Sequence, residues 1–257
     1  MNLWQAVLLG VVEGLTEFLP VSSTGHLILA SHLMGIGEES FTKSFEIAIQ
    51  SGAILAVVFL YLERFLKDLE VWKRIIVAFL PTGALGFLLY KFIKSYLIGN
   101  EKVVVASLIG GGIFLLFADR LCERYCHIGD ISQLSYKRAF VVGVFQSLAM
   151  VPGVSRSAST IIGGMLMGLN RRTAAEFSFL LAVPTMFVAT SYDLYKSHGE
   201  FNTSEWYLLA VGFLSSFITA LITVKLFLGY VSKHSFVPFG IYRILVGIIY
   251  AVFFIHG

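Results

Sequence analysis

The chain has 257 residues, of which 57% are hydrophobic and only 14% are charged. Soluble domains carry about 25% charged residues, so the composition excludes an ordinary soluble protein and predicts a single all-helical integral membrane domain over residues 1–257. The formal net charge of +3 is small and spread over loops, which gives no case for a nucleic-acid partner.

The first apolar segment, residues 1–34, is interrupted. Its first half is typical of a helix but contains Glu13 and Glu17, and Pro20 with the Ser-Ser-Thr-Gly cluster at 22–25 then breaks it. Each half is too short to cross a bilayer, and opened backbone at membrane depth is tolerated only beside protein or a water-filled cavity. We therefore predict a re-entrant helix-loop-helix that enters a polar chamber. The alternative is an amphipathic hairpin on the membrane surface.

Six uninterrupted apolar runs are long enough to cross a bilayer. They lie at roughly 45–62, 75–93, 103–118, 175–192, 206–229 and 238–255. Between the third and fourth runs, the segment 136–169 repeats the interrupted design, with a break at Pro152-Gly153. The predicted fold is a polytopic membrane protein with six transmembrane helices and two re-entrant helix-loop-helix segments.

The two interrupted segments resemble each other. An offset of 133 residues places Gly10 on Gly143 and Ser22 on Ser155. Each segment precedes three candidate spans, and because three is odd, the second copy must lie upside down relative to the first. We expect an inverted-topology repeat whose hairpin tips can meet, with repeat one at about 1–119 and repeat two at about 136–257.

Loop charge predicts the orientation of the chain. On the side of the N terminus lie five basic residues, namely Lys43, Lys91, Lys94, Lys102 and Lys196. On the other side lie twelve, namely Arg64, Lys67, Lys73, Arg74, Arg120, Arg124, Lys137, Arg138, Arg171, Arg172, Lys225 and Lys233. Positive residues favour the cytoplasm, so the first hairpin should open to the outside of the plasma membrane.

Glu13 and Glu17 are four residues apart, which places both on one face of a helix. Carboxylates in hydrocarbon are unfavourable unless a cation accepts them, and oxygen ligands suit Mg²⁺ or Ca²⁺. We expect a divalent metal here that takes its remaining ligands from water and phosphate. The simpler alternative is that both side chains face water.

The hydroxyls of Ser22, Ser23 and Thr24 precede a helix start, where hydroxyl and free backbone N–H groups bind phosphate well. Ordinary capping of the helix explains one of these serines equally well. Capping does not require His26, which could serve as a general base or as a phosphate-accepting nucleophile.

Arg156 lies between Ser155 and Ser157 in the second hairpin, with Thr160 one turn further on. A guanidinium binds phosphate through two parallel donors and keeps its charge, although snorkelling to a headgroup is the alternative. Arg243, alone in the last span, should pair with an intramembrane carboxylate or snorkel. Together the two hairpin tips carry the groups that phosphoryl transfer uses, and their depth implies a phosphate on a lipid.

The segments VVEGLTEFLPVSSTGHL at 11–27 and VPGVSRSAST at 151–160 resemble the two signature motifs of the undecaprenyl-pyrophosphate phosphatase (bacitracin-resistance) family. The resemblance runs over essentially the whole chain and implies six spans with two re-entrant segments in an inverted repeat. It also implies removal of the terminal phosphate of undecaprenyl pyrophosphate, which regenerates the lipid carrier for cell-wall polymers. The family's motif residues fall on Glu13, Glu17, Ser23, His26 and Arg156. Ala158 stands where the family often has glycine, which affects local backbone freedom only.

The expected site therefore has Glu17, Ser23, His26 and Arg156 as catalytic residues. Phosphate binding falls to Ser22, Thr24, Ser155, Ser157 and Thr160, and metal binding to Glu13 and Glu17. The attacking group is Ser23 or a water activated by His26 or Glu17, and the site opens to the periplasmic face of the inner membrane. A transporter or flippase of a phosphorylated polyprenyl lipid is the competing hypothesis, because inverted repeats with broken helices are typical of transporters. The sequence leaves monomer and homodimer open.

Overall fold

The structure, a computed structural model, describes residues 1–97, 100–122, 125–197 and 203–255. Within these ranges the side chains of 90–92, 94–95, 121–122, 192–197, 203–204 and 253–255 lie outside the description. Of the basic residues in the charge count, the side chains of Lys91, Lys94 and Lys196 and the whole of Arg124 therefore lie outside the description.

The described residues form helices and no strand. The long helices are α3 (Ser40–Leu60), α5 (Leu69–Phe92), α6 (Glu101–Cys122), α9 (Arg171–Ser197), α10 (Thr203–Val231) and α11 (Val237–Ile255). Five of them, α3, α5, α6, α9 and α10, are long and apolar enough to cross a membrane, whereas the apolar stretch found in α11, Val237–Val252, is shorter. The chain is a multi-pass membrane protein. Pro81 lies inside α5 and Pro184 lies inside α9. Proline is tolerated inside membrane helices because neighbouring helices can satisfy the backbone groups that it leaves without partners.

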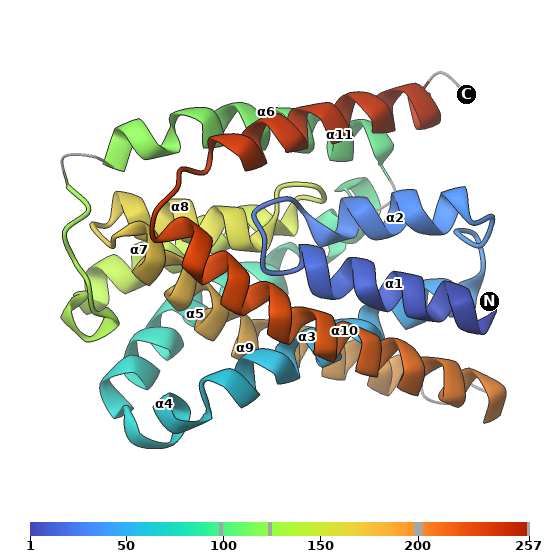
Figure 1. Cartoon of the computed structure of the whole chain (residues 1–257), viewed down its shortest axis with the longest axis horizontal. Coiled ribbons are helices and arrows are strands. Elements are labelled where there is room, and N and C mark those ends of the chain that lie inside the picture. Colours follow the sequence, from blue (N-terminus) through green and yellow to red (C-terminus); the bar gives the residue numbers. More distant parts are fainter. Residues whose placement is uncertain (98–99, 123–124, 198–202, 256–257) are drawn as a thin grey trace.

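Both interrupted segments form helix pairs. The first consists of α1 (Leu3–Thr16) and α2 (Ser23–Leu33), and the second of α7 (Tyr136–Ser147) and α8 (Arg156–Leu166). Asn2 caps α1 through a reciprocal pair of hydrogen bonds with Gln5, at 2.9 and 2.8 Å. The two pairs lie towards opposite ends of the molecule, and their turns meet near its middle (Figure 1).

Four short elements complete the chain. They are α4 (Leu62–Lys67), the π-helix η1 (Ile93–Leu97) and the 3₁₀ turns η2 (Ile131–Gln133) and η3 (Leu148–Met150).

Small residues bring the hairpin helices very close to the long helices. A Cβ at Gly10 of α1 would lie 2.5 Å from the carbonyl oxygen of Gly212 in α10. A Cβ at Gly143 of α7 would lie 1.9 Å from the carbonyl oxygen of Ala78 in α5. Because lipid is as apolar as the side chains, membrane helices gain little from the hydrophobic effect when they associate. Close backbone contact through small residues gives them van der Waals packing energy instead.

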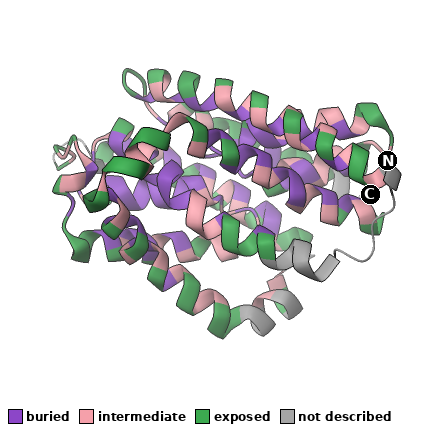
Figure 2. Ribbon diagram, turned by 90° about the horizontal axis from the view of Figure 1, so that it is seen from below, coloured by how far each residue is buried: buried purple, intermediate pink, exposed green. Residues whose placement is uncertain are grey.

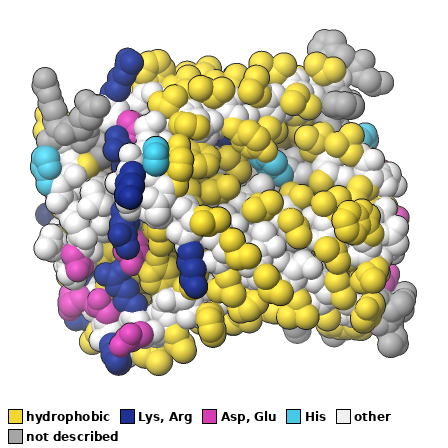
Figure 3. Space-filling view, in the orientation of Figure 1, with side chains coloured by type: hydrophobic (Ala, Val, Ile, Leu, Met, Phe, Trp, Pro, Cys, Tyr) yellow, Lys and Arg dark blue, Asp and Glu magenta, His cyan; other side chains and the backbone are white. Residues whose placement is uncertain are grey.

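Buried and charged side chains are distributed unevenly over the molecule. Buried residues fill the interior between the helices, with green exposed positions outside (Figure 2). Apolar side chains cover the middle of the visible face, which suits contact with lipid (Figure 3). Large apolar side chains such as Phe87 and Leu88 are exposed. Lys and Arg side chains gather at the end opposite the N terminus (Figure 3). Ion pairs link several of them to acidic groups, among them Arg64 to Glu176 and Arg171 to Asp119.

Candidate active site

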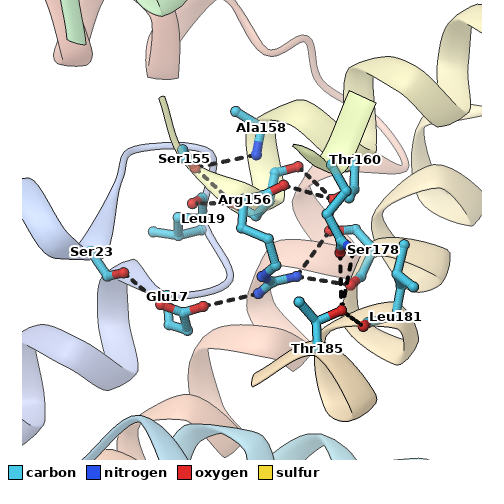
Figure 4. A network of polar contacts seen from close by, with 12 residues as sticks. Glu17, Leu19, Ser23, Ser155, Arg156, Ala158, Thr160, Ser178, Leu181 and Thr185 are labelled. Carbon is cyan, nitrogen blue, oxygen red and sulfur yellow. Dashed lines mark hydrogen bonds and ion pairs between the residues drawn. The ribbon is translucent and has the colours of Figure 1, made fainter. Parts of the chain in front are cut away.

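The two hairpin turns touch each other directly. Ser157 Oγ donates a hydrogen bond of 2.6 Å to the carbonyl oxygen of Leu19. Arg156 Nη2 lies 3.1 Å from Glu17 Oε1, which forms an ion pair between side chains 139 residues apart in sequence (Figure 4). The expectation that the hairpin tips meet is confirmed.

Each turn contains one serine in a strained backbone conformation. Ser22 has φ 73° and Ser155 has φ 77°, and among the described residues no other non-glycine residue has a positive φ. Each serine is the N-cap of the second helix of its hairpin. Strained conformations of this kind persist where the surrounding structure enforces them, and they concentrate at functional sites. The two turns thus share one uncommon geometry at the positions that the 133-residue offset aligns.

Glu17 is the centre of the contact between the hairpins. Its Oε2 accepts a hydrogen bond of 2.5 Å from Ser23 Oγ, while its Oε1 faces Arg156. The Glu17 side chain is nearly buried, at 6% exposure. A serine hydroxyl, a carboxylate and a guanidinium thus form one continuous line of contacts. Within it, the carboxylate can accept the hydroxyl proton.

Arg156 is held from both sides. Nη1 donates to the Ser178 carbonyl oxygen at 2.9 Å, and the guanidinium carbon lies 5.7 Å from the centre of the Phe18 ring. Nε is buried and has no hydrogen-bond partner, so donors remain for a ligand. Thr160 Oγ1 donates to Ser178 Oγ at 2.6 Å and supports this arrangement from behind.

A polar cavity of about 230 Å³ opens beside this line of groups. The first hairpin contributes Glu17, Ser22, Ser23 and Thr24, and the second contributes Pro152, Gly153, Ser155 and Arg156. Ser157 and Thr160 do not line the cavity, since their hydroxyls bond to backbone and to Ser178. The structure brings most of the expected phosphate-binding residues to one place.

Four polar residues from the helices line the same cavity and were missed by the motif analysis, namely Gln50, Thr82, Gln146 and Thr185. Gln146 Nε2 donates to Thr82 Oγ1 at 2.9 Å and to Thr185 Oγ1 at 3.2 Å, so one amide joins three helices. The sequence contained a signal for two of them, because Gln50 interrupts an apolar run and the offset aligns Gln146 with Glu13.

Glu13 is fully buried, and neither of its carboxylate oxygens has a hydrogen-bond partner. The ionisable side chains that act on it electrostatically are the carboxyls of Glu17 and Glu46 and the guanidinium of Arg156. A buried carboxyl group without a donor needs a cation or a proton. Among the described residues, no group of three or more His, Cys, Asp or Glu side chains could hold a metal by itself.

His26 points towards α11, and it is not among the residues that line the cavity. Its Nδ1 lies 2.8 Å from the carbonyl oxygen of Ser22, which can only accept, so Nδ1 carries the proton. Its Nε2 lies 2.8 Å from the hydroxyl of Tyr242, and the two rings are stacked 5.5 Å apart. Both ring nitrogens are therefore engaged with the protein.

Arg243 contradicts both interpretations made from the sequence. The side chain is 0% exposed, so it does not snorkel, and it has no carboxylate partner among the ion pairs of the described residues. Its guanidinium instead donates to backbone carbonyl oxygens. These belong to Pro20 at 3.2 Å, Ser107 at 3.0 Å, Leu108 at 3.4 Å, Gly153 at 2.8 Å and Val154 at 3.0 Å. The partners are carbonyl groups far apart in sequence, which no local pattern reveals.

Two interrupted helix pairs that meet beside a polar cavity, among helices long enough to cross a membrane, define a membrane protein with a buried site of charged side chains. The family model described as bacitracin resistance protein BacA matches residues 6–249, and the chain belongs to this family. It is 64% identical to a protein named undecaprenyl-diphosphatase from Aquifex aeolicus (strain VF5), over 99% of this chain and 100% of that protein. Proteins of the same name from Persephonella marina and Thermus thermophilus are 55% and 54% identical, over 98% and 100% of this chain and 99% of each relative.

Proposed function

We propose that this chain is an undecaprenyl-diphosphatase, which hydrolyses undecaprenyl pyrophosphate to undecaprenyl phosphate and inorganic phosphate. The observation that carries the proposal is the line from Ser23 through Glu17 to Arg156 at the wall of the polar cavity. The full-length similarity to relatives with this name supports it. The product is a lipid carrier for cell-wall synthesis, and its recycling gives resistance to bacitracin.

The attacking group in this proposal is the hydroxyl of Ser23. Its oxygen forms a bond to the terminal phosphorus while Glu17 accepts its proton, and the bond from phosphorus to the bridging oxygen breaks. Undecaprenyl phosphate leaves with that oxygen, and water then hydrolyses the phosphoserine. Arg156 donates to the phosphoryl oxygens as charge moves onto the leaving group. His26 takes no direct part, because its two nitrogens hold Ser22 and Tyr242.

Glu13 and Glu17 are the residues that would hold a divalent metal, Mg²⁺ or Ca²⁺. The fit rests on the two carboxylate oxygens of Glu13, which are buried and have no partner. Two carboxylates do not fill a coordination sphere, so water and phosphate oxygens would complete it, as is usual for Mg²⁺. When bound, the metal would neutralise part of the pyrophosphate charge.

The proposed topology has six transmembrane helices, with α11 as the sixth, and two re-entrant hairpins in an inverted repeat. Aligned positions behave alike in the two halves, which supports it. Ser22 and Ser155 share a positive φ, and Gly10 and Gly143 each let a hairpin helix touch the backbone of a long helix. The first hairpin lies at the end away from the basic side chains, so the cavity would open to the periplasmic face of the inner membrane (Figures 1 and 3).

The test is phosphate release from undecaprenyl pyrophosphate by purified protein in detergent, with and without a chelator. We expect release without any ion gradient, and its loss on chelation. Ser23→Ala should reduce turnover at least about a thousandfold, or about 4 kcal/mol, and abolish labelling of the protein by ³²P-pyrophosphate lipid. Ser232→Ala is the matched control, because Ser232 makes only a backbone hydrogen bond on an exposed helix end. Full activity of Ser23→Ala would assign the attack to water, and lipid movement without phosphate release would favour a flippase.

A further inference from the structure

Arg243 donates hydrogen bonds to carbonyl groups that the interrupted helices leave without partners. A helix that stops at membrane depth has carbonyl oxygens without intrahelical partners, and these must be satisfied inside the protein. Pro20 belongs to the first turn, and Gly153 and Val154 belong to the second. One guanidinium bonds to all three and also to α6 through Ser107 and Leu108.

The same turns carry the reacting groups. Pro20 lies three residues after Glu17 and three before Ser23, and Val154 lies two residues before Arg156. A guanidinium is planar, so its donors impose a fixed spacing on the carbonyl groups that they contact. The Glu17–Arg156 pair bridges these two turns at 3.1 Å.

We propose that Arg243 is a positioning residue for phosphoryl transfer, which sets the distance between the two turns and so places Arg156 against Glu17 and Ser23. The neighbouring Tyr242 extends this role, because its hydroxyl holds His26, whose Nδ1 donates to the carbonyl oxygen of Ser22. Consecutive residues of α11 thereby fix both turns. The inference rests on the proposed function.

Two adjacent glycines of α6 provide a matched test that leaves Arg243 in the chain. A Cβ at Gly111 would lie 2.4 Å from Arg243 Nη2 and 2.8 Å from its Cζ, so Gly111→Ala must displace the guanidinium. A Cβ at Gly110 would meet nothing within 4 Å. The two substitutions change helix propensity alike, and only one of them moves the arginine.

A second control is an arginine with similar bonds elsewhere. Arg74 is also nearly buried and donates to the carbonyl oxygens of Leu134 and Glu70 at 2.6 and 2.8 Å, but it joins α5 to the loop before α7. Arg74→Lys should lower the melting temperature and leave kcat unchanged. Arg243→Lys keeps the charge and loses the planar set of donors.

The experiment measures kcat, KM and Tm for the wild type and for Arg243→Lys, Gly111→Ala, Gly110→Ala and Arg74→Lys. We expect kcat to fall at least about tenfold in the first two variants, with KM changed less than about twofold, because misplacement affects the transition state more than binding. Gly110→Ala should match the wild type. If Arg243→Lys does not fold, Gly111→Ala against Gly110→Ala decides.

Coupling to Arg156 separates positioning from simple stability. If Arg243 acts through Arg156, the loss of kcat in Arg243→Lys/Arg156→Lys should be at least about threefold smaller than the product of the two single losses. The inference would be overturned if the loss of kcat in the double variant equals the product of the two single losses, or if kcat is unchanged in Arg243→Lys and Gly111→Ala. Either result would leave an active wild type and the proposed function intact. A wild type that releases no phosphate would instead refute the proposed function, and the inference with it.

Discussion

Replacing Arg156 with lysine tests the site most sharply, because it retains the positive charge. In the structure the guanidinium donates to the Ser178 carbonyl oxygen, to Ser178 Oγ at 3.4 Å and to Glu17, and its Nε has no partner. Two of its five N–H groups remain for phosphoryl oxygens. An ammonium group has three donors in total, so after the same three contacts it offers none.

The substitution thus removes about two charge-assisted hydrogen bonds, each worth about 1.5–3 kcal/mol. Allowing for water that enters beside the smaller group, we expect Arg156→Lys to lower kcat at least about a hundredfold, or about 2.7 kcal/mol, with a smaller effect on KM. Arg156→Ala should be only slightly more damaging.

The assay is steady-state phosphate release by purified variants in detergent. Arg171→Lys is the control, because Arg171 pairs with Asp119 at 2.5 Å and does not line the cavity. Should Arg156→Lys retain most of its turnover and lose only substrate affinity, Arg156 would be a headgroup anchor, and the reasoning from donor number would be wrong.

Three further predictions follow from burial, packing and charge. Glu13→Gln should reduce turnover at least about tenfold, or about 1.4 kcal/mol, and weaken the response to Mg²⁺ in a metal titration; full activity with the same titration curve would remove its metal role. Gly143→Ala should destabilise the protein by about 1–3 kcal/mol in thermal unfolding, since its Cβ would overlap Ala78 O, and an unchanged Tm would argue against this helix contact. In intact cells, an impermeant thiol reagent should label Gly37→Cys but not Gln133→Cys, and the reverse would place the cavity in the cytoplasm.

The interruptions of the helices were predictable because their causes are local. Pro20, and Pro152 followed by Gly153, disfavour continuation of a helix, and the flanking hydroxyl residues mark the turns. The offset of 133 residues also predicted that Ser22 and Ser155 would have equivalent places, and both have the same unusual φ. Proline alone was not decisive, since Pro81 and Pro184 lie within continuous helices.

The contacts of the site were harder to predict, because they join distant parts of the chain. His26 is a plausible catalytic group by its motif, yet its orientation depends on Tyr242, 216 residues away. Arg243 bonds to backbone carbonyl oxygens, which have no side-chain signature in a sequence. The role of Gln146 likewise depends on two threonines from other helices.

The backbone contacts at the glycines bear on how far this molecule can move. Alternating access would require a hairpin to slide or rock against the long helices beside it. Along α1, however, a Cβ at Gly10 or at Gly14 would lie 2.5 Å from a carbonyl oxygen of α10, so no flexible side chain lies between the two helices to absorb a displacement. On the other side of the cavity, Gly143 seats α7 on α5 in the same way. Two hairpins fixed in this manner suit a chamber with one permanent opening, from which the lipid enters and leaves by the same side.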